Sequence, residues 1–340
     1  MPGQQLFEIA RRTFDTPEFR GIECIEVEAK SVINKVPAAS QVPFDYTINP
    51  YRGCTHACTY CFARPTHTYL DMNAGRDFET KIVVKVNAPE VLRRELAAKR
   101  WKGDHIAMGT NTDPYQRVEG RYRLMRGILG ALIDHRNPFS ILTKGTLITR
   151  DVDLLVRAAE HAPVSAAFSI GTLDEEVWRD TEPGTPAPKA RMEALRTLVD
   201  AGIPTGVLIA PILPGLSDRP DQLRTVVEAA IDAGASSVSP IMLHLRRGVR
   251  EEFMPWLREH HPDLVERYER AYRTPYGRKE EREALSRRVR SYTAGRMGKI
   301  ERTVAGRFGH RAADRGRGTP EPREPEQLSL WERSPGRHHP

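Results

Sequence analysis

The chain has 340 residues, a formal net charge of +7 and a hydrophobic content of 39%. It is long enough to bury a sizeable core, and α/β barrels of this length commonly form one domain. The sequence has no run of about eighteen or more apolar residues, and its first residues lack the pattern of a signal peptide. We therefore expect no membrane span and predict a cytoplasmic protein.

The positive charge is concentrated in the C-terminal part of the chain. Residues 1–243 carry 29 Lys and Arg against 30 Asp and Glu, whereas residues 244–340 carry 23 against 15. Such an excess fits a solvated, Arg-rich surface, and it equally fits electrostatic attraction to nucleic acid. The charge pattern leaves both interpretations open.

Residues 1–43 are interpreted as a lead-in that packs on the following domain. The residue types predict a short helix over residues 5–12 and an extended segment of alternating character over residues 23–32. Cys24 lies in the extended segment, where a small, half-buried thiol is the simplest interpretation. We expect no metal-binding or redox role for it.

The next stretch contains three of the four cysteines within eight positions, spaced C-x3-C-x2-C: Cys54, Cys58 and Cys61. A cytosolic chain gains no disulfide framework from three thiols on one loop. Thiolates do bind soft metal centres, among which zinc and iron–sulfur clusters are the main candidates. A structural zinc site needs four protein ligands, so it would have to recruit His56, His67 or the distant Cys24.

Beyond this loop, short β-branched runs alternate with amphipathic stretches, which predicts βαβ units and a parallel sheet. The expected strands are 44–49, 81–86, 105–109, 139–143, 164–170, 204–212 and 237–243. The expected helices are 88–99, 122–135, 151–159, 187–201 and 221–233. From residue 250 to about 292, charged residues with spaced apolar ones predict two or three further surface helices.

Polar residues follow several of the expected strands, and in parallel barrels the chemistry lies at the carboxyl ends of the strands. Thr112 and Asp113 come after strand 105–109, Lys144 follows strand 139–143, and Ser169 lies near the end of strand 164–170. Plainer interpretations are a turn capped by Asp113 and a strand-end hydroxyl at Ser169 whose hydrogen bonds are satisfied. Lys144 is harder to explain as a random surface charge.

Four motifs occur in an order that resembles the radical S-adenosylmethionine (SAM) superfamily. They are N-P-Y-R-G-C-x-H-x-C-x-Y-C, T-D-P-Y-Q, T-K-G-T-L-I-T-R-D and P-I-L-P-G-L-S-D. The nearest form is the Rv2578c-type group, which is related to spore photoproduct lyase, and the resemblance covers about residues 25–260. It implies an α/β fold with a partial (β/α)6 barrel over residues 44–245. A basic helical extension over 246–295 and a disordered tail over 296–340 would follow. Because such a barrel has six strands, one of the seven expected strands is extra.

The resemblance also implies the cofactors and their contacts. In this superfamily three cysteines hold a [4Fe–4S] cluster, and SAM binds the fourth iron and is cleaved reductively to a 5′-deoxyadenosyl radical. Cys54, Cys58 and Cys61 would be the ligands, and a protein such as flavodoxin or ferredoxin would donate the electron. The resemblance implies which part of SAM each residue would contact. Thr112 and Asp113 would contact the ammonium, Lys144 the carboxylate, and Ser169 the ribose or methionine end, whereas Tyr60, Ile209 and Pro211 would lie near the adenine.

One departure bears on the substrate. Spore photoproduct lyase places a hydrogen-donor cysteine where this chain has Thr110, and no cysteine follows Cys61. Reversal of a thymine dimer by that route is therefore not expected, and the substrate stays open, with nucleic acid as a candidate. The alternatives are a zinc-stabilised nucleic-acid-binding protein and a clamp-tethered accessory protein without catalysis.

An apolar cluster interrupts the polar C-terminal tail at Gln327-Leu328-Ser329-Leu330-Trp331. A disordered segment has no folding reason to carry two leucines and a tryptophan so close together. The pattern resembles the short peptide by which bacterial replication and repair proteins dock on the DNA sliding clamp. In the alternative interpretation the segment folds back onto the barrel.

Overall fold

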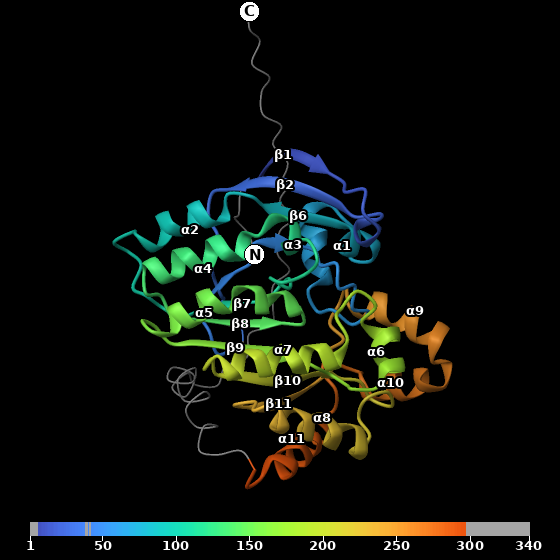
Figure 1. Cartoon of the computed structure of the whole chain (residues 1–340). Helices are drawn as coiled ribbons and strands as arrows, with labels where there is room; N and C mark the ends of the chain where they lie inside the picture. Colours follow the sequence, from blue (N-terminus) through green and yellow to red (C-terminus); the bar gives the residue numbers. More distant parts are fainter. Residues whose placement is uncertain (1–5, 38–39, 41, 297–340) are drawn as a thin grey trace, which may run out of the picture.

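A computed structural model describes residues 6–37, 40 and 42–296. Within these residues the strands form two sheets (Figure 1). The larger sheet has the strand order β11-β10-β9-β8-β7-β4-β3, and the smaller one has the order β1-β2-β6-β5. The larger sheet forms the barrel, and the smaller sheet lies beside it at the N-terminal end of the chain (Figure 1).

Six strands of the larger sheet run parallel to their neighbours, which confirms the predicted partial barrel. They are β4 (Tyr46–Ile48), β7 (Ile106–Met108), β8 (Phe139–Thr143), β9 (Val164–Ser169), β10 (Thr205–Ile212) and β11 (Val238–Met242). The short strand β3 (Ile33–Lys35) adds antiparallel to β4. The carboxyl ends of the six strands therefore lie together at one end of the barrel.

Amphipathic helices connect these strands and cover the outer face of the sheet (Figure 1). They are α2 (Ala88–Leu96), α4 (Leu124–Asp134), α5 (Val152–Ala159), α7 (Pro188–Asp200) and α8 (Pro220–Asp232). Their apolar sides are buried, as Ile128, Leu129 and Leu132 of α4 show. All five lie where the sequence predicts them, because an apolar stripe at helical spacing must face the core.

Shorter elements lie mainly in the connections. They are η1 (Pro17–Phe19), η2 (Arg64–Leu70), α1 (Arg76–Thr80), α3 (Glu119–Tyr122), η3 (Thr146–Asp151) and α6 (Glu175–Thr181). Residues after 245 form α9 (Arg250–His260), η4 (Pro262–Leu264), α10 (Val265–Ala271) and α11 (Lys279–Thr293), which confirms the expected surface helices.

The prediction of a helix over residues 5–12 is wrong, because this segment forms strand β1 (Leu6–Arg12). It pairs antiparallel with β2 (Glu23–Ala29), and the Arg11 guanidinium lies 3.3 Å from the Glu23 carboxylate. A segment this short is barely stable as an isolated helix. The backbone hydrogen bonds that the neighbouring strand offers decide its structure instead.

The predicted barrel strand 81–86 belongs to the smaller sheet and is the extra one. It forms β6 (Lys81–Lys85), which lies between β2 and β5 (Tyr51–Arg52). A run of buried apolar residues indicates a strand but carries no information about which sheet it joins. Cys24, on β2, is fully buried rather than half-buried.

None of the helices in the described part of the chain combines the length and the apolar character that a membrane span requires. The segment Gln327–Trp331 and the rest of the predicted tail from residue 297 onward lie outside the described residues.

Candidate functional site

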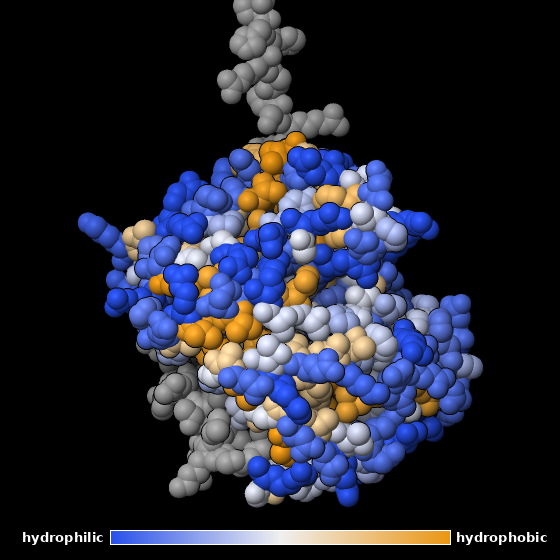
Figure 2. Space-filling model, in the orientation of Figure 1, coloured by the Kyte–Doolittle hydropathy of each residue, from blue (hydrophilic) through white to orange (hydrophobic). Residues whose placement is uncertain are grey.

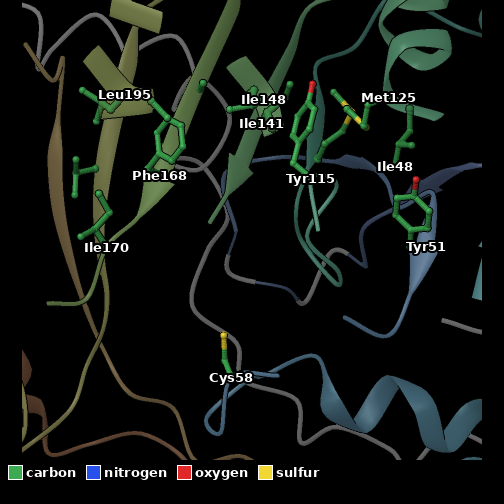
Figure 3. Close-up of a cluster of buried hydrophobic side chains, with 14 of the residues drawn as sticks. Ile48, Tyr51, Cys58, Tyr115, Met125, Ile141, Ile148, Phe168, Ile170 and Leu195 are labelled. Carbon is green, nitrogen blue, oxygen red and sulfur yellow. The ribbon is translucent and has the colours of Figure 1, made fainter. Parts of the chain in front are cut away.

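The three cysteines lie on a loop that follows β5 at the carboxyl end of the barrel. Cys54 and Cys58 are buried, and Cys61 is half-buried. The Cys61 amide donates to the Cys58 carbonyl at 3.2 Å, and the Cys54 amide donates to the Phe78 carbonyl at 2.9 Å. Figure 3 shows the sulfur of Cys58 pointing up, toward the space between Phe168 and Tyr115.

Two glycines make the course of this loop possible. Gly53 has a φ of +80°, and a Cβ there would lie 2.8 Å from the Phe78 carbonyl oxygen. A Cβ at Gly184 would lie 2.1 Å from the carbonyl oxygen of Thr55. The Gly184 amide donates to the His56 carbonyl at 3.0 Å, so the connection after α6 is pressed against the cysteine loop.

Buried polar side chains hold the backbone of the loop in place. Gln116 is fully buried, accepts from the Thr55 amide at 2.9 Å and donates to the Gly53 carbonyl at 3.0 Å. The Thr112 hydroxyl donates to the same carbonyl at 2.7 Å. Each of these groups would lose its partner if the loop moved, and an unpaired buried polar group is costly.

Arg64 anchors the other end of the loop. Its guanidinium is buried, donates to the Cys58 carbonyl at 2.9 Å and 3.2 Å, and pairs with Glu79. A further bond reaches the Ala74 carbonyl at 3.0 Å. These hydrogen bonds fix the backbone that carries the three thiols.

The donor set fits an iron–sulfur cluster. Burial raises the pKa of each of the three thiols, so a cationic centre is needed to keep them as thiolates. Within the described ranges, no three or more His, Cys, Asp or Glu side chains are arranged to hold a single metal ion. In a [4Fe–4S] cluster each cysteine binds its own iron atom, so the thiols need not converge on one point.

The side chains that a zinc site would need as a fourth ligand make other contacts or lie in the other sheet. The Nδ1 atom of His56 lies 3.4 Å from the Asp113 carboxylate. The Nε2 atom of His67 hydrogen-bonds the Lys81 carbonyl at 2.9 Å. Cys24 lies in the smaller sheet. The arrangement therefore favours the cluster over the zinc alternative.

Lys144 brings several of the predicted site residues together. Its Nζ atom donates to the Ser169 hydroxyl at 2.5 Å and to the Ala210 carbonyl at 3.4 Å. The same atom lies 5.7 Å from the centre of the Tyr60 ring. The ends of β8, β9 and β10 and the cysteine loop thus meet around one ammonium group.

Glu182 and Arg191 complete this cluster, and the sequence analysis missed both. The Glu182 carboxylate lies 3.6 Å from Lys144 Nζ, accepts from the Tyr60 hydroxyl and pairs with Arg191. Arg191 also donates to the Ser169 carbonyl at 3.0 Å. Burial alone would raise the pKa of Glu182, but Arg191 and Lys144 outweigh it and lower this pKa to about 2.

The charges of this cluster leave room for an anion. Lys144 and Arg191 carry two positive charges, and ionised Glu182 carries one negative charge. All three side chains are largely buried, where an unbalanced charge is costly. A bound carboxylate would balance the remaining positive charge, and the amino-acid end of SAM presents such a group.

Asp113 is occupied by bonds within the protein. Its carboxylate accepts from the Thr143 hydroxyl and the Lys144 amide, both at 2.6 Å, and from the Tyr115 amide at 2.9 Å. Burial raises its pKa, but nearby His56 and these hydrogen bonds lower it further, so the net shift is downward. Asp113 thus ties the loop after β7 to the end of β8. The contacts of Thr112 and Asp113 with the SAM ammonium stay predictions.

The β10 strand contributes through its backbone. Ile209 is fully buried and Pro211 is half-buried. Between them, the Ala210 carbonyl accepts from the Ser169 hydroxyl at 2.6 Å. The predicted contact of Ile209 and Pro211 with adenine stays a prediction, as do the other assigned roles.

Of the site residues that the sequence did not predict, Gln116 could have been found from a motif. Gln116 is the last residue of the T-D-P-Y-Q motif, so a buried role could have been expected. Glu182 lies in the connection between α6 and α7, and Arg191 lies on α7. No spacing rule indicates that these two side chains turn toward Tyr60, because that depends on how the connection folds back on the cysteine loop.

Comparisons with known proteins point to one family. The model of the Radical SAM superfamily matches residues 48–228. The chain is 50% identical over 290 residues to the uncharacterized protein Rv2578c of Mycobacterium tuberculosis (strain ATCC 25618 / H37Rv), with 85% of each chain covered. It is 36% identical over 199 residues to the uncharacterized protein MJ0683 of Methanocaldococcus jannaschii, covering 58% of this chain and 70% of that one.

Among solved structures, the fold is similar to that of a spore photoproduct lyase complexed with dinucleoside spore photoproduct. The TM-score is 0.59 at 16% sequence identity, and 82% of each chain is covered. At this identity the likeness establishes the shared fold.

Proposed function

Because the chain belongs to the radical SAM superfamily, we propose that this enzyme applies radical SAM chemistry to a nucleic-acid substrate. Cys54, Cys58 and Cys61 would hold the cluster, and SAM would lie against Tyr60 and Lys144. When bound, a reduced [4Fe–4S] cluster supplies the electron that cleaves SAM to methionine and a 5′-deoxyadenosyl radical. The protein supplies orientation and exclusion of water.

The residues around Lys144 would bind and orient the amino-acid end of SAM. The Lys144 ammonium would attract the carboxylate of SAM. The Ser169 hydroxyl accepts a hydrogen bond from Lys144 Nζ and so holds this side chain in place. Glu182 is shared between Arg191 and Lys144, so one of the two positive charges remains for the ligand. The burial of Lys144, Glu182 and Arg191 strengthens these contacts, since charged groups interact more strongly away from water.

The observation that carries the substrate proposal is a basic surface, formed by residues 243–250 and 272–279, at whose edge the Gly248 amide donates to the Glu251 carboxylate. These two segments contain six Lys and Arg and no Asp or Glu. They lie side by side, because the Leu245 amide donates to the Pro275 carbonyl at 2.8 Å and His244 pairs with Tyr276. Arg278 and Lys279 have α11 glutamates 3.9 Å and 3.8 Å away. Arg246, Arg247 and Arg273 are exposed.

An exposed aromatic ring lies among these cations. Tyr276 is 38% exposed, and its ring meets the His244 ring edge-on with 4.8 Å between the centroids. The Arg246 guanidinium lies 5.4 Å from the Tyr276 ring centroid and donates to the Tyr276 hydroxyl at 2.6 Å. Cations that contact phosphates, beside a ring on which a base can stack, are typical of surfaces that bind single-stranded nucleic acid.

The basic surface adjoins the cysteine loop. Segment 243–250 follows β11 at the carboxyl end of the barrel. A Cβ at Gly248 would lie 2.6 Å from the Cγ atom of Pro65, four residues after Cys61. Phe62, directly after Cys61, is 55% exposed. A strand bound along this surface would therefore pass close to the cluster and SAM.

The likeness to a lyase that is complexed with a dinucleoside supports a nucleic-acid substrate as well. The reaction would differ from that of the lyase, because Thr110 stands where the lyase has its hydrogen-donor cysteine. The Thr110 hydroxyl instead hydrogen-bonds the Asn49 side chain at 3.3 Å. We therefore propose hydrogen abstraction from a nucleic acid without that donor.

Binding of a fluorescein-labelled single-stranded oligonucleotide tests the substrate proposal. The double variant Arg246→Ala and Arg247→Ala should weaken binding about tenfold or more and flatten its dependence on salt concentration. The matched control removes two exposed cations from another surface, Arg94→Ala and Arg100→Ala, and should bind like the wild type. Equal affinity of all three proteins, or a wild type that does not bind, would rule out this surface.

The proposed partners follow from this function. Flavodoxin or ferredoxin would donate the electron, and the Gln327–Trp331 segment would bring the enzyme to a DNA sliding clamp. Both partners, and DNA itself, agree with the predicted cytoplasmic location.

A further inference from the structure

A cavity lies on the outer side of the cysteine loop. It has a volume of about 580 Å³, and its walls come from the N-terminal lead-in and the loops after β7, β8 and α6. Residues that line it include Phe19, His56, Arg117, Arg121, Leu147 and Pro186. Figure 2 shows the surface notched at its right edge, between the part that carries α1 and the part that carries α9 in Figure 1. We call this space the outer cavity.

One short segment lies between the outer cavity and the side chains around Lys144. Glu182 points inward to Tyr60 and Lys144. The next four residues, 183–186, line the outer cavity. The substrate surface and the SAM site therefore leave this side of the loop unused.

The wall between the outer cavity and the cysteines is one residue thick. His56 lines the cavity, and its carbonyl oxygen lies 4.0 Å from the sulfur of Cys58. The Nδ1 atom of the His56 ring lies 3.4 Å from the Asp113 carboxylate. Electron tunnelling slows steeply with distance, so a donor that reaches this wall is well placed to reduce a cluster on Cys58.

The rim of the outer cavity carries an excess of positive charge. Arg117 donates to the backbone carbonyl of Glu18 at 2.5 Å and also attracts the Glu18 carboxylate, so this one carboxylate faces two guanidinium groups. Arg121 lies 3.7 Å from the Glu18 carboxylate, and its guanidinium lies 5.3 Å from the Phe19 ring centroid. Both side chains of that ion pair are about half exposed, so water screens their attraction.

We infer that the outer cavity is the docking site of the electron donor, an acidic protein with its redox group at the surface. The two guanidinium groups attract the acidic rim of the donor, and the apolar walls of Phe19 and Leu147 receive the edge of a planar redox group. The donor is oxidised by one electron and the cluster is reduced by one, with no atom transferred. This inference rests on the superfamily's cluster reduction and is independent of the nucleic-acid substrate.

Stopped-flow reduction of the reconstituted full-length protein tests the inference. With fully reduced flavodoxin as the probe at low ionic strength, Arg117→Glu and Arg121→Glu together should slow the bleaching of the cluster about tenfold or more. Arg157→Glu, an exposed charge reversal on α5, should not slow it. Dithionite is small and needs no docking site, so it should reduce all three proteins within about twofold of one rate. A double variant that flavodoxin reduces at the wild-type rate overturns the inference.

Hydrogen exchange of the wild type gives a second test that needs no variant. Oxidised flavodoxin should protect residues 117–121 and 146–147 from exchange, and the protection should weaken with added salt. Protection confined to residues 243–250 and 272–279 would overturn the inference. Neither measurement involves nucleic acid, so a failed substrate proposal would leave both results unchanged.

Discussion

Lys144 is the side chain on which SAM binding should depend most. Lys144→Met removes a charge-assisted contact with the SAM carboxylate, which is worth about 1.5–3 kcal/mol. SAM affinity should therefore fall by about one to two orders of magnitude, while the iron content stays normal because Lys144 is not a ligand. Calorimetry with anaerobic, reconstituted protein measures the change. Unchanged affinity would contradict the role of Lys144.

Glu182 should stabilise the fold in a pH-dependent way. Its folded-state pKa of about 2 lies below the ordinary value of 4.5. Ionised Glu182 thus stabilises the protein fully above about pH 4.5, and this contribution is lost as the pH falls toward 2. At pH 7, Glu182→Gln should cost about 3–5 kcal/mol, because Lys144 and Arg191 lose their anionic partner.

Urea unfolding of the apo-protein at several pH values measures this effect. The Glu182→Gln variant should lose less stability than the wild type between about pH 4.5 and 2, since its side chain does not titrate. Glu160→Gln is the control, because the Glu160 side chain is 61% exposed. Parallel pH profiles of wild type and Glu182→Gln would show that Glu182 is not held ionised by its partners.

At the scale of single residues, the sequence predicted the site residues that lie in a motif or directly after a strand, because these features can be recognised from neighbouring residues alone. Tyr60, Lys144 and Ser169 are of this kind, and the structure brings them together. Glu182 and Arg191 were not predictable, because their approach to Tyr60 depends on the path of the α6–α7 connection. Asp113 differs from both groups. The sequence predicted that it belongs to the site, and in the structure its carboxylate accepts hydrogen bonds from the end of β8.

At the scale of elements, the packing of the α6–α7 connection on the cysteine loop should decide whether the cluster can form. Gly184→Ala places a Cβ 2.1 Å from the Thr55 carbonyl oxygen, so the loop has to shift. The variant should bind less iron and lose about 1–3 kcal/mol of stability. Iron analysis and chemical unfolding measure the two effects.

Gly130→Ala is the matched control for this substitution. Gly130 lies within α4, and a Cβ there meets nothing closer than 3.4 Å. Alanine favours a helix over glycine by about 1 kcal/mol, so this control should be at least as stable as the wild type. Full iron content in Gly184→Ala would show that the loop is not fixed by this contact.

Sequence periodicity predicted most of the helices and strands, but it failed for two strands. Periodicity predicted the five long helices and the six parallel strands, because each must bury an apolar face against its neighbours. It failed for β1, whose short sequence fits either state until β2 supplies hydrogen bonds. It also placed β6 in the wrong sheet, since strand order depends on pairing between distant segments.

At the scale of the whole molecule, the C-terminal segment should connect the enzyme to DNA replication or repair. A peptide of residues 325–334 should bind a purified bacterial sliding clamp at micromolar strength, because Leu330 and Trp331 are apolar anchors in a polar stretch. Replacing both with Ala should eliminate binding in a fluorescence titration. An intact peptide that does not bind at high micromolar concentration would refute this prediction.

The most direct test of the account is anaerobic incubation of the reconstituted enzyme with SAM and reductant, with 5′-deoxyadenosine measured by chromatography. The wild type and Cys24→Ala should form it, and an added single-stranded oligonucleotide should increase the amount. Cys58→Ala should form none, because it lacks one of the three cluster ligands. The account would be contradicted if wild-type protein with full iron content left SAM intact, or if Cys58→Ala bound normal iron and cleaved SAM like the wild type.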